Sequence, residues 1–314
     1  MKYKTRENSL KRGTTVEERT KKLHKRIWEK AASIEDLAGR PLQAVKDSDA
    51  TAIAREFGLS LHDVYRELLK LGVYPYRYLR NRGAISADEQ LKLAESKIAV
   101  VGAGGLGGHA IMLLARLGIG SLVVVDREVF DETNLNRQAL CNTEAVGTPK
   151  AAAAVSAVAA INPGVNVFPY QTRLDAGNAR EILAGSDVIV DALDSVGDRF
   201  LLEEAARSLG TPLVHGTLAG FEGWVMTIFP GDEGLKNIYG ADGAERASDE
   251  RPQDLLGVPG VTPVLIAAFQ VMEVLKILLG RENIFRDKIL HVDLERGCLN
   301  EFSFRTPVLS DGKS

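Results

Sequence analysis

The chain has 314 residues, of which 45% are hydrophobic and 26% charged, and its formal net charge is -3. This length and composition predict a globular protein of about two domains that needs no disulfide or metal to hold its core. Its two cysteines, Cys141 and Cys298, exclude a disulfide framework and an all-cysteine zinc site within one chain. The charged N-terminus and the interrupted apolar runs predict neither a secretory signal nor a membrane span, so we expect a cytoplasmic protein.

The N-terminal part of the chain is basic and predicted to be helical. Its first 30 residues carry eleven Lys or Arg against four Glu, a composition that suits contact with nucleic acid or an acidic partner but also a solvated helix over residues 15–30, which we favour. Two short helices are predicted at 49–57 and 61–71. The second presents a neutral set of charges, which is poor for reading DNA. We therefore expect residues 1–75 to form a helical appendage that packs or contacts a partner, with nucleic acid an unlikely ligand.

From residue 97 the chain alternates between short apolar strands and helices. The predicted strands are 97–101, 121–126, 165–170, 187–192 and 212–215. The predicted helices follow the first strand up to residue 117 and cover 149–161, 177–184 and 197–209. This alternation predicts an α/β fold with a doubly wound, mostly parallel Rossmann-like sheet over residues 76–314. After residue 212 we expect an antiparallel extension, composed of a strand at 224–229, a polar loop at 231–258, a helix at 261–279 and a terminal hairpin.

A glycine-rich turn follows the first of these strands. Gly102, Gly104 and Gly107 form a G-x-G-x-x-G pattern between a strand and a helix, where glycine lets the backbone approach phosphates. Asp126 ends the next strand, nineteen residues after Gly107, and can bind ribose hydroxyls. The pattern predicts an adenine-nucleotide site, and an NAD-dependent enzyme would show the same one.

The polar segment that follows Asp126 favours a triphosphate over a dinucleotide. Arg137 offers a forked guanidinium and Lys150, at the start of a helix, offers a compact charge. Asp191 and Asp194 come at the end of another strand, on the ligand-binding edge of such a sheet. A carboxylate there can hold a Mg²⁺ that bridges ATP phosphates.

Several strings of this chain occur together in one known family. They are Arg77-Tyr78-Leu79-Arg80, the glycine-rich turn, Thr133-Asn134-Leu135-Asn136-Arg137-Gln138, Lys150, Asp191 to Asp194, and Gln270-x-x-Glu273-x-x-Lys276. In these strings, from about residue 76 to residue 294, the chain resembles the HesA/MoeB/ThiF family, relatives of the ubiquitin-activating enzymes. The Asn-Leu-x-Arg-Gln string, residues 134–138, is the most specific part of the resemblance.

The resemblance implies an ATP-dependent adenylyltransferase, a nucleotidyltransferase that uses ATP and Mg²⁺. Its partner would be a small ubiquitin-like sulfur carrier protein, whose C-terminal Gly-Gly carboxylate becomes an acyl-adenylate as pyrophosphate leaves. The implied nucleotide contacts are Gly102, Gly104, Gly105, Gly107, Asp126, Thr133, Asn134, Arg137, Gln138, Lys150, Asp194 and Ser195. Arg137, Lys150 and Asp194 would act in catalysis, with Asp194 on the Mg²⁺. Arg80 would reach the site of the neighbouring subunit in a homodimer.

The chain departs from the family pattern in three respects. It lacks the two C-x-x-C pairs that bind zinc in many relatives, so we expect no zinc site. The 231–258 loop has no cysteine to serve as a covalent acceptor, and Ser195 stands where the family usually has Asn. Cys141 fits a small buried hydrophobe better than a nucleophile.

Two alternative functions remain open at this stage. One is an enzyme of the same superfamily that dehydrates threonylcarbamoyl-adenosine in tRNA. The other is a nucleotide-sensing regulator whose helical appendage binds DNA.

Overall fold

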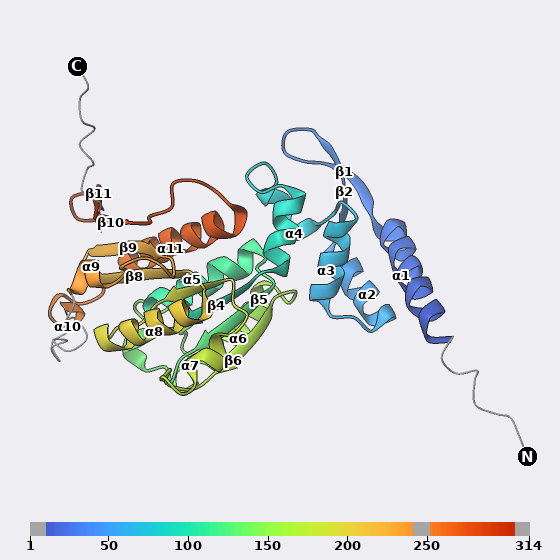
Figure 1. Ribbon diagram of the computed structural model, residues 1–314. Helices are drawn as coiled ribbons and strands as arrows, with labels where there is room; N and C mark the ends of the chain where they lie inside the picture. The colour runs from blue at the N-terminus through green and yellow to red at the C-terminus, as the bar shows by residue number, and fades with distance from the viewer. Residues whose placement is uncertain (1–10, 241–251, 305–314) are drawn as a thin grey trace, which may run out of the picture. The chain divides into compact units, whose positions relative to one another are not determined.

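The computed structural model of the chain describes residues 11–240 and 252–304, and it divides the chain into two compact units, Met1–Ala94 and Glu95–Ser314 (Figure 1). The sequence places the start of the enzyme domain at residue 76. The structural division falls later because residues 76–94 pack with the N-terminal unit, where Leu79 and Ala87 lie against Tyr74.

The N-terminal unit combines helices with a small sheet. Its elements are α1 (Lys11–Lys30), β1 (Ala32–Glu35), β2 (Pro41–Val45), α2 (Asp47–Phe57), α3 (Leu61–Lys70), β3 (Val73–Pro75), the 3-10 helix η1 (Tyr76–Asn81) and α4 (Ala87–Glu95). The expected helices are present, and Ser60 caps α3 by accepting a hydrogen bond from the Asp63 backbone. The three-stranded sheet was not expected from the sequence. Ile27, Ile53 and Leu68 are fully buried and join the helices into one core.

The C-terminal unit is built on an eight-stranded sheet of order β11-β10-β9-β8-β7-β4-β5-β6. The strands are β4 (Lys97–Val101), β5 (Ser121–Val125), β6 (Asn166–Tyr170), β7 (Val188–Asp191), β8 (Leu213–Ala219), β9 (Glu222–Ile228), β10 (Lys288–Asp293) and β11 (Cys298–Ser303). The five strands from β6 to β8 are parallel, and β9 to β11 extend the sheet in antiparallel fashion. This confirms the predicted α/β fold, with its mostly parallel doubly wound sheet and antiparallel extension.

Helices cover both faces of this sheet. They are α5 (Gly105–Leu117), α6 (Lys150–Ile161), α7 (Ala179–Leu183), α8 (Val196–Leu209), α9 (Lys236–Tyr239), α10 (Pro252–Leu256) and α11 (Val261–Leu279), with the 3-10 helix η2 (Glu132–Asn134) before α6. On one face α5 packs against both α6 and α11, and on the other α7 packs against α8 (Figure 1). By length and composition α11 could cross a membrane, but its buried residues Ile266 and Val274 identify it as a core helix of the sheet.

Buried polar side chains fix α11 to the sheet. Gln270 donates its Nε2 hydrogens to the carbonyls of Asp191, at 2.8 Å, and Val214, at 3.1 Å. Glu273 is fully buried, and its carboxylate accepts hydrogen bonds from the Thr227 hydroxyl and the Phe285 backbone, both at 2.7 Å. The Gln270-x-x-Glu273-x-x-Lys276 string therefore has a structural role, because Gln270 and Glu273 join α11 to β7, β8, β9 and the segment at Phe285.

Truncating Glu273 tests this role. Lys276 Nζ lies 2.6 Å from the other oxygen of Glu273 and 2.8 Å from the Asn283 carbonyl, so Glu273→Ala leaves a largely buried ammonium without its counter-charge and the buried Phe285 N–H without its acceptor. We expect the free energy of unfolding to fall by about 3–5 kcal/mol. Urea denaturation measures it, with Glu282→Ala, at an exposed acid just beyond the helix, expected to change it by less than about 0.5 kcal/mol. Equal stability of the two variants would contradict the assignment.

Candidate active site

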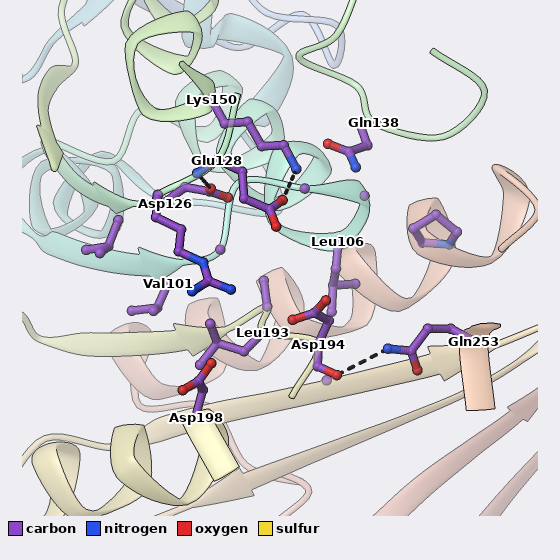
Figure 2. Close-up of a pocket in the computed structure, with 18 of the residues that line it drawn as sticks. Val101, Leu106, Asp126, Glu128, Gln138, Lys150, Leu193, Asp194, Asp198 and Gln253 are labelled. Carbon is purple, nitrogen blue, oxygen red and sulfur yellow. Dashed lines mark hydrogen bonds and ion pairs between the residues drawn. The ribbon is translucent and has the colours of Figure 1, made fainter. Parts of the chain in front are cut away.

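A cavity of about 370 Å³ opens at the carboxyl ends of the parallel strands (Figure 2). It lies where β4 has β5 on one side and β7 on the other, which is the switch point at which doubly wound sheets bind ligands. Most of the expected site residues line it: Gly102, Gly104, Gly105, Asp126, Asn134, Arg137, Gln138, Lys150 and Asp194. Gly107, Thr133 and Ser195 do not, and Arg80 belongs to the N-terminal unit.

In the glycine-rich turn the backbone passes very close to other backbone segments. Gly102 has φ +94°, and a Cβ there would lie 2.4 Å from the Ala192 carbonyl oxygen. A Cβ on Gly107 would lie 1.8 Å from the Gly102 carbonyl oxygen, so this glycine serves the contact between turn and helix. The first backbone N–H groups of α5, which begins at Gly105, are thereby held at the cavity, where they suit an anion.

Asp126 holds the turn from the end of β5. Its carboxylate accepts hydrogen bonds from the backbone N–H groups of Ala103 and Glu128, both at 2.7 Å. Burial raises the pKa of the Asp126 carboxyl above its ordinary value, although these donors and Lys150 act in the opposite direction. The position of Asp126 on the cavity wall suits it to accept a hydroxyl donor.

Lys150 is a nearly buried cation at the first position of α6. Its side chain is 5% exposed, its ammonium lies 2.7 Å from a carboxylate oxygen of Glu128, and the Phe130 ring lies 5.8 Å below it. Figure 2 draws this ion pair at one end of the cavity. Sequence reasoning did not single out Glu128. Its position two residues after Asp126, in a segment that already contained one acid, was the only available signal.

The segment from Asn134 to Gln138 is shaped by its own polar side chains. Asn134 accepts a hydrogen bond from the Asp131 backbone at 3.1 Å, and Arg137 donates to the Thr133 carbonyl at 2.9 Å. Thr133 bonds to Asp131, at 2.8 Å, and so shapes the turn beside the cavity. Gln138 is 6% exposed and lines the cavity, and its Oε1 has no hydrogen-bond partner among the residues that the structure describes. Its side-chain oxygen is therefore available to a ligand donor.

The two aspartates after β7 differ in environment. Asp191 is fully buried and accepts hydrogen bonds from His215 Nδ1, at 2.7 Å, and from the Leu193 backbone, at 3.0 Å. Burial holds the pKa of His215 below its ordinary value, against the opposing effect of Asp191. Asp194 is exposed to the cavity, and its carbonyl accepts a hydrogen bond from Gln253 at 3.1 Å (Figure 2).

The next residue, Ser195, has a local role in the structure. Its hydroxyl accepts a hydrogen bond from the Asp198 backbone at 3.2 Å and caps the N-terminus of α8. Its predicted contact with the nucleotide stays a prediction.

The far end of the cavity combines apolar and charged side chains. Val101, Leu193 and Asp198 lie on the opposite side of it from Lys150 and Gln138 in Figure 2. Arg173, which the sequence analysis did not select, bridges to Asp198 with 2.7 Å between guanidinium and carboxylate. One end of the cavity thus suits phosphates, and the other suits an apolar ring with polar edges.

Cys141 lies near this site but lacks the environment of a reactive thiol. Its sulfur lies 3.9 Å from the Asp131 carbonyl oxygen, and burial raises the pKa of the thiol above its ordinary value. A nucleophilic cysteine needs the opposite shift.

In the described ranges no three His, Cys, Asp or Glu side chains gather to hold a metal ion by themselves. A single carboxylate at Asp194 is the kind of site that Mg²⁺ uses, because this ion takes one or two carboxylates and completes its shell with water and substrate phosphates. Asp191 is committed to His215 and the backbone.

Comparison with known proteins gives consistent matches. Residues 78–308 match the model of the ThiF family. The SAMP-activating enzyme E1 of Haloferax volcanii is 37% identical over 232 residues, which cover 73% of this chain and 85% of that protein. The sulfur carrier protein adenylyltransferase of Thermus thermophilus is 36% identical over 205 residues, 62% of this chain and 74% of its own. The chain spans about half the length of some other curated relatives.

Solved structures show the same fold. The crystal structure of E. coli MccB with ATP aligns with a TM-score of 0.61 at 20% identity, over 83% of this chain and 84% of that one.

Proposed function

The chain belongs to the ThiF family, and from that premise we propose that it is an ATP-dependent adenylyltransferase acting on the C-terminal carboxylate of a ubiquitin-like sulfur carrier protein. The observation that carries the proposal is that the glycine-rich turn, Arg137, Lys150 and Asp194 line one cavity. A helix N-terminus and two cations around one pocket match a triphosphate. We expect the enzyme to work in the cytoplasm.

The proposed reaction asks the protein for position and charge. The carrier carboxylate attacks the α-phosphorus of ATP, the bond from that phosphorus to the bridging oxygen breaks, and an acyl-adenylate and pyrophosphate form. The nucleophile is already ionised, so no general base is required. Lys150 and Arg137 stabilise the charge that develops on the phosphates, and Asp126 orients the ribose. Bound at Asp194, Mg²⁺ would neutralise phosphate charge.

The basic N-terminal helix gives little support to a nucleic-acid ligand. Several cations of α1 pair with acids of the same unit: Lys21 with Glu17, Arg26 with Glu29 and Glu56, and Lys30 with Asp49. Charges neutralised in this way attract phosphates weakly. We therefore favour the adenylyltransferase over both the tRNA dehydratase and the DNA-binding regulator.

Removing either phosphate-binding cation tests the site. Lys150→Ala and Arg137→Ala should each slow ATP–pyrophosphate exchange, with carrier present, by about 10²–10³-fold, as when one preorganised donor is lost from a developing anion. Arg116→Ala removes the same charge at an exposed arginine of α5, away from the cavity. This variant should catalyse ATP–pyrophosphate exchange at the wild-type rate. Wild-type exchange in both cavity variants would remove the assignment.

Asp194→Asn tests the Mg²⁺ site. A metal-facing anion becomes neutral, so we expect the Mg²⁺ concentration at half-maximal exchange to rise at saturating ATP. The matched control is Glu144→Gln, at an exposed acid outside the cavity lining. Superimposable Mg²⁺ titrations of Asp194→Asn and wild type would assign Asp194 to the ordinary surface acids.

We propose further that the enzyme is a homodimer whose sites are completed by Arg80 of the neighbouring subunit. Within the N-terminal unit Arg77 pairs with Asp47 at 2.5 Å and Arg82 with Asp36 at 3.3 Å. Arg80 lies between them on η1 and is exposed, as is Tyr76 at 47%. Two arginines therefore hold η1 in its unit while the third is presented to solvent, where a guanidinium can reach a phosphate in another subunit.

Mixing two inactive variants decides whether sites are shared. In Arg80→Ala plus Lys150→Ala heterodimers, one of the two sites would have both residues intact. Random exchange should restore activity to about a quarter of wild type. Recovery should rise with the extent of exchange, which differently tagged subunits measure. No recovery after demonstrated exchange would show that Arg80 does not act in trans.

A further inference from the structure

We propose that Glu128 is a positioning residue for Lys150, holding its ammonium toward the cavity until the phosphates of the nucleotide take the place of the carboxylate. The inference rests on the proposed function, because it takes ATP as the ligand of the cavity. It assigns a role to a side chain that lines the phosphate end of the cavity beside the expected contacts.

The two partners of this ion pair differ in their freedom to move. The Lys150 side chain is 5% exposed and lies over Phe130, and the backbone N–H of Lys150 donates to the Glu128 carbonyl at 2.9 Å. The Glu128 side chain is 55% exposed, so its carboxylate has solvent beside it when it leaves the ammonium. A ligand that competes for the ammonium will therefore displace Glu128 and leave Lys150 in place.

The local charge makes this displacement necessary. Glu128 contacts the ammonium, and Asp126, which is fixed by its two backbone donors, is close enough for the charge of Lys150 to act on it. Lys150 lowers and Glu128 raises the pKa of Asp126, because both charges act on this carboxyl. A triphosphate that approached Lys150 with Glu128 still in contact would meet like charge at close range, which is strongly unfavourable.

The same pair preserves the site while it is empty. A cation whose side chain is nearly buried is costly without a counter-charge, and Glu128 supplies one at 2.7 Å. ATP affinity is then set by the difference between phosphate and carboxylate as partners of Lys150. Neutralising Glu128 removes the competitor and should strengthen ATP binding, whereas an acid that bound the metal or the substrate would weaken binding when lost.

The experiment compares Glu128→Gln with wild type by calorimetric titration of MgATP and of adenosine. We expect the dissociation constant for MgATP to fall about tenfold, as one like charge leaves the phosphate site, and that for adenosine to stay unchanged. Glu144→Gln, the same charge change at an exposed acid outside the cavity lining, should match wild type for both ligands. In a Lys150→Ala background the added Glu128→Gln change should have a much smaller effect on MgATP affinity, because the pair no longer exists.

Unchanged or weaker MgATP binding by Glu128→Gln overturns the inference, as does equal tightening of adenosine. An effect of full size in the Lys150→Ala background overturns it as well. Glu128→Ala supplies the same comparison if the amide variant does not fold. Wild-type protein that binds no MgATP overturns the proposed function and this inference together, whereas wild-type binding without the variant effect overturns the inference alone.

Discussion

The rest of the site is organised around the Lys150 ammonium, which is almost completely buried. Lys150 starts α6 with its side chain 5% exposed, so it needs a counter-charge at all times. Glu128 provides that charge from the segment after β5, and Asp126 provides the next negative charge along the same segment. Phosphates are suited to replace the carboxylate, because they carry at least as much negative charge and accept charge-assisted hydrogen bonds from an ammonium. The chemistry of the pocket follows from this requirement.

The sheet supplies the geometry. In parallel strands the carboxyl ends meet at one edge, so the glycine-rich turn after β4, Asp126 after β5 and Asp194 after β7 converge although they come from distant parts of the chain. Buried polar side chains fix the backbone at that edge. Gln270 of α11 binds the carbonyl of Asp191, and Arg199 donates to the Leu193 carbonyl at 2.6 Å. The backbone that carries Asp194 is therefore held from both faces of the sheet, and its carboxylate can be exposed without being mobile.

Elements with strong local signals were predictable from the sequence, and those that depend on pairing were not. The structure agrees with the predicted strands β4, β5 and β7 and with the predicted helix α11. Buried parallel strands and core helices can be recognised in a sequence because they are continuous apolar runs. The N-terminal sheet was missed because its strands are three to five residues long and one pair is parallel, so little in the local sequence marks them. The expected cavity residues came from the glycine-rich pattern, from charges at strand ends and from the family resemblance, which alone implied Asn134 and Gln138. Glu128 and Arg173 could not be located in this way, since their roles come from partners 22 and 25 residues away in the chain.

The residues that were assigned to the nucleotide but do not line the cavity explain what the family-like strings encode. Gly107 makes room for the turn, Thr133 bonds to Asp131 beside the cavity, and Ser195 caps α8. Each stabilises a segment whose neighbour lines the cavity, namely Leu106, Asn134 and Asp194. Their contact with the nucleotide stays a prediction, and the role that the structure shows for them is support of these segments. Loss of such a support should change ATP affinity and the free energy of unfolding together, whereas we propose that loss of Lys150 or Arg137 impairs exchange in a protein that still folds, because these side chains would act on the ligand.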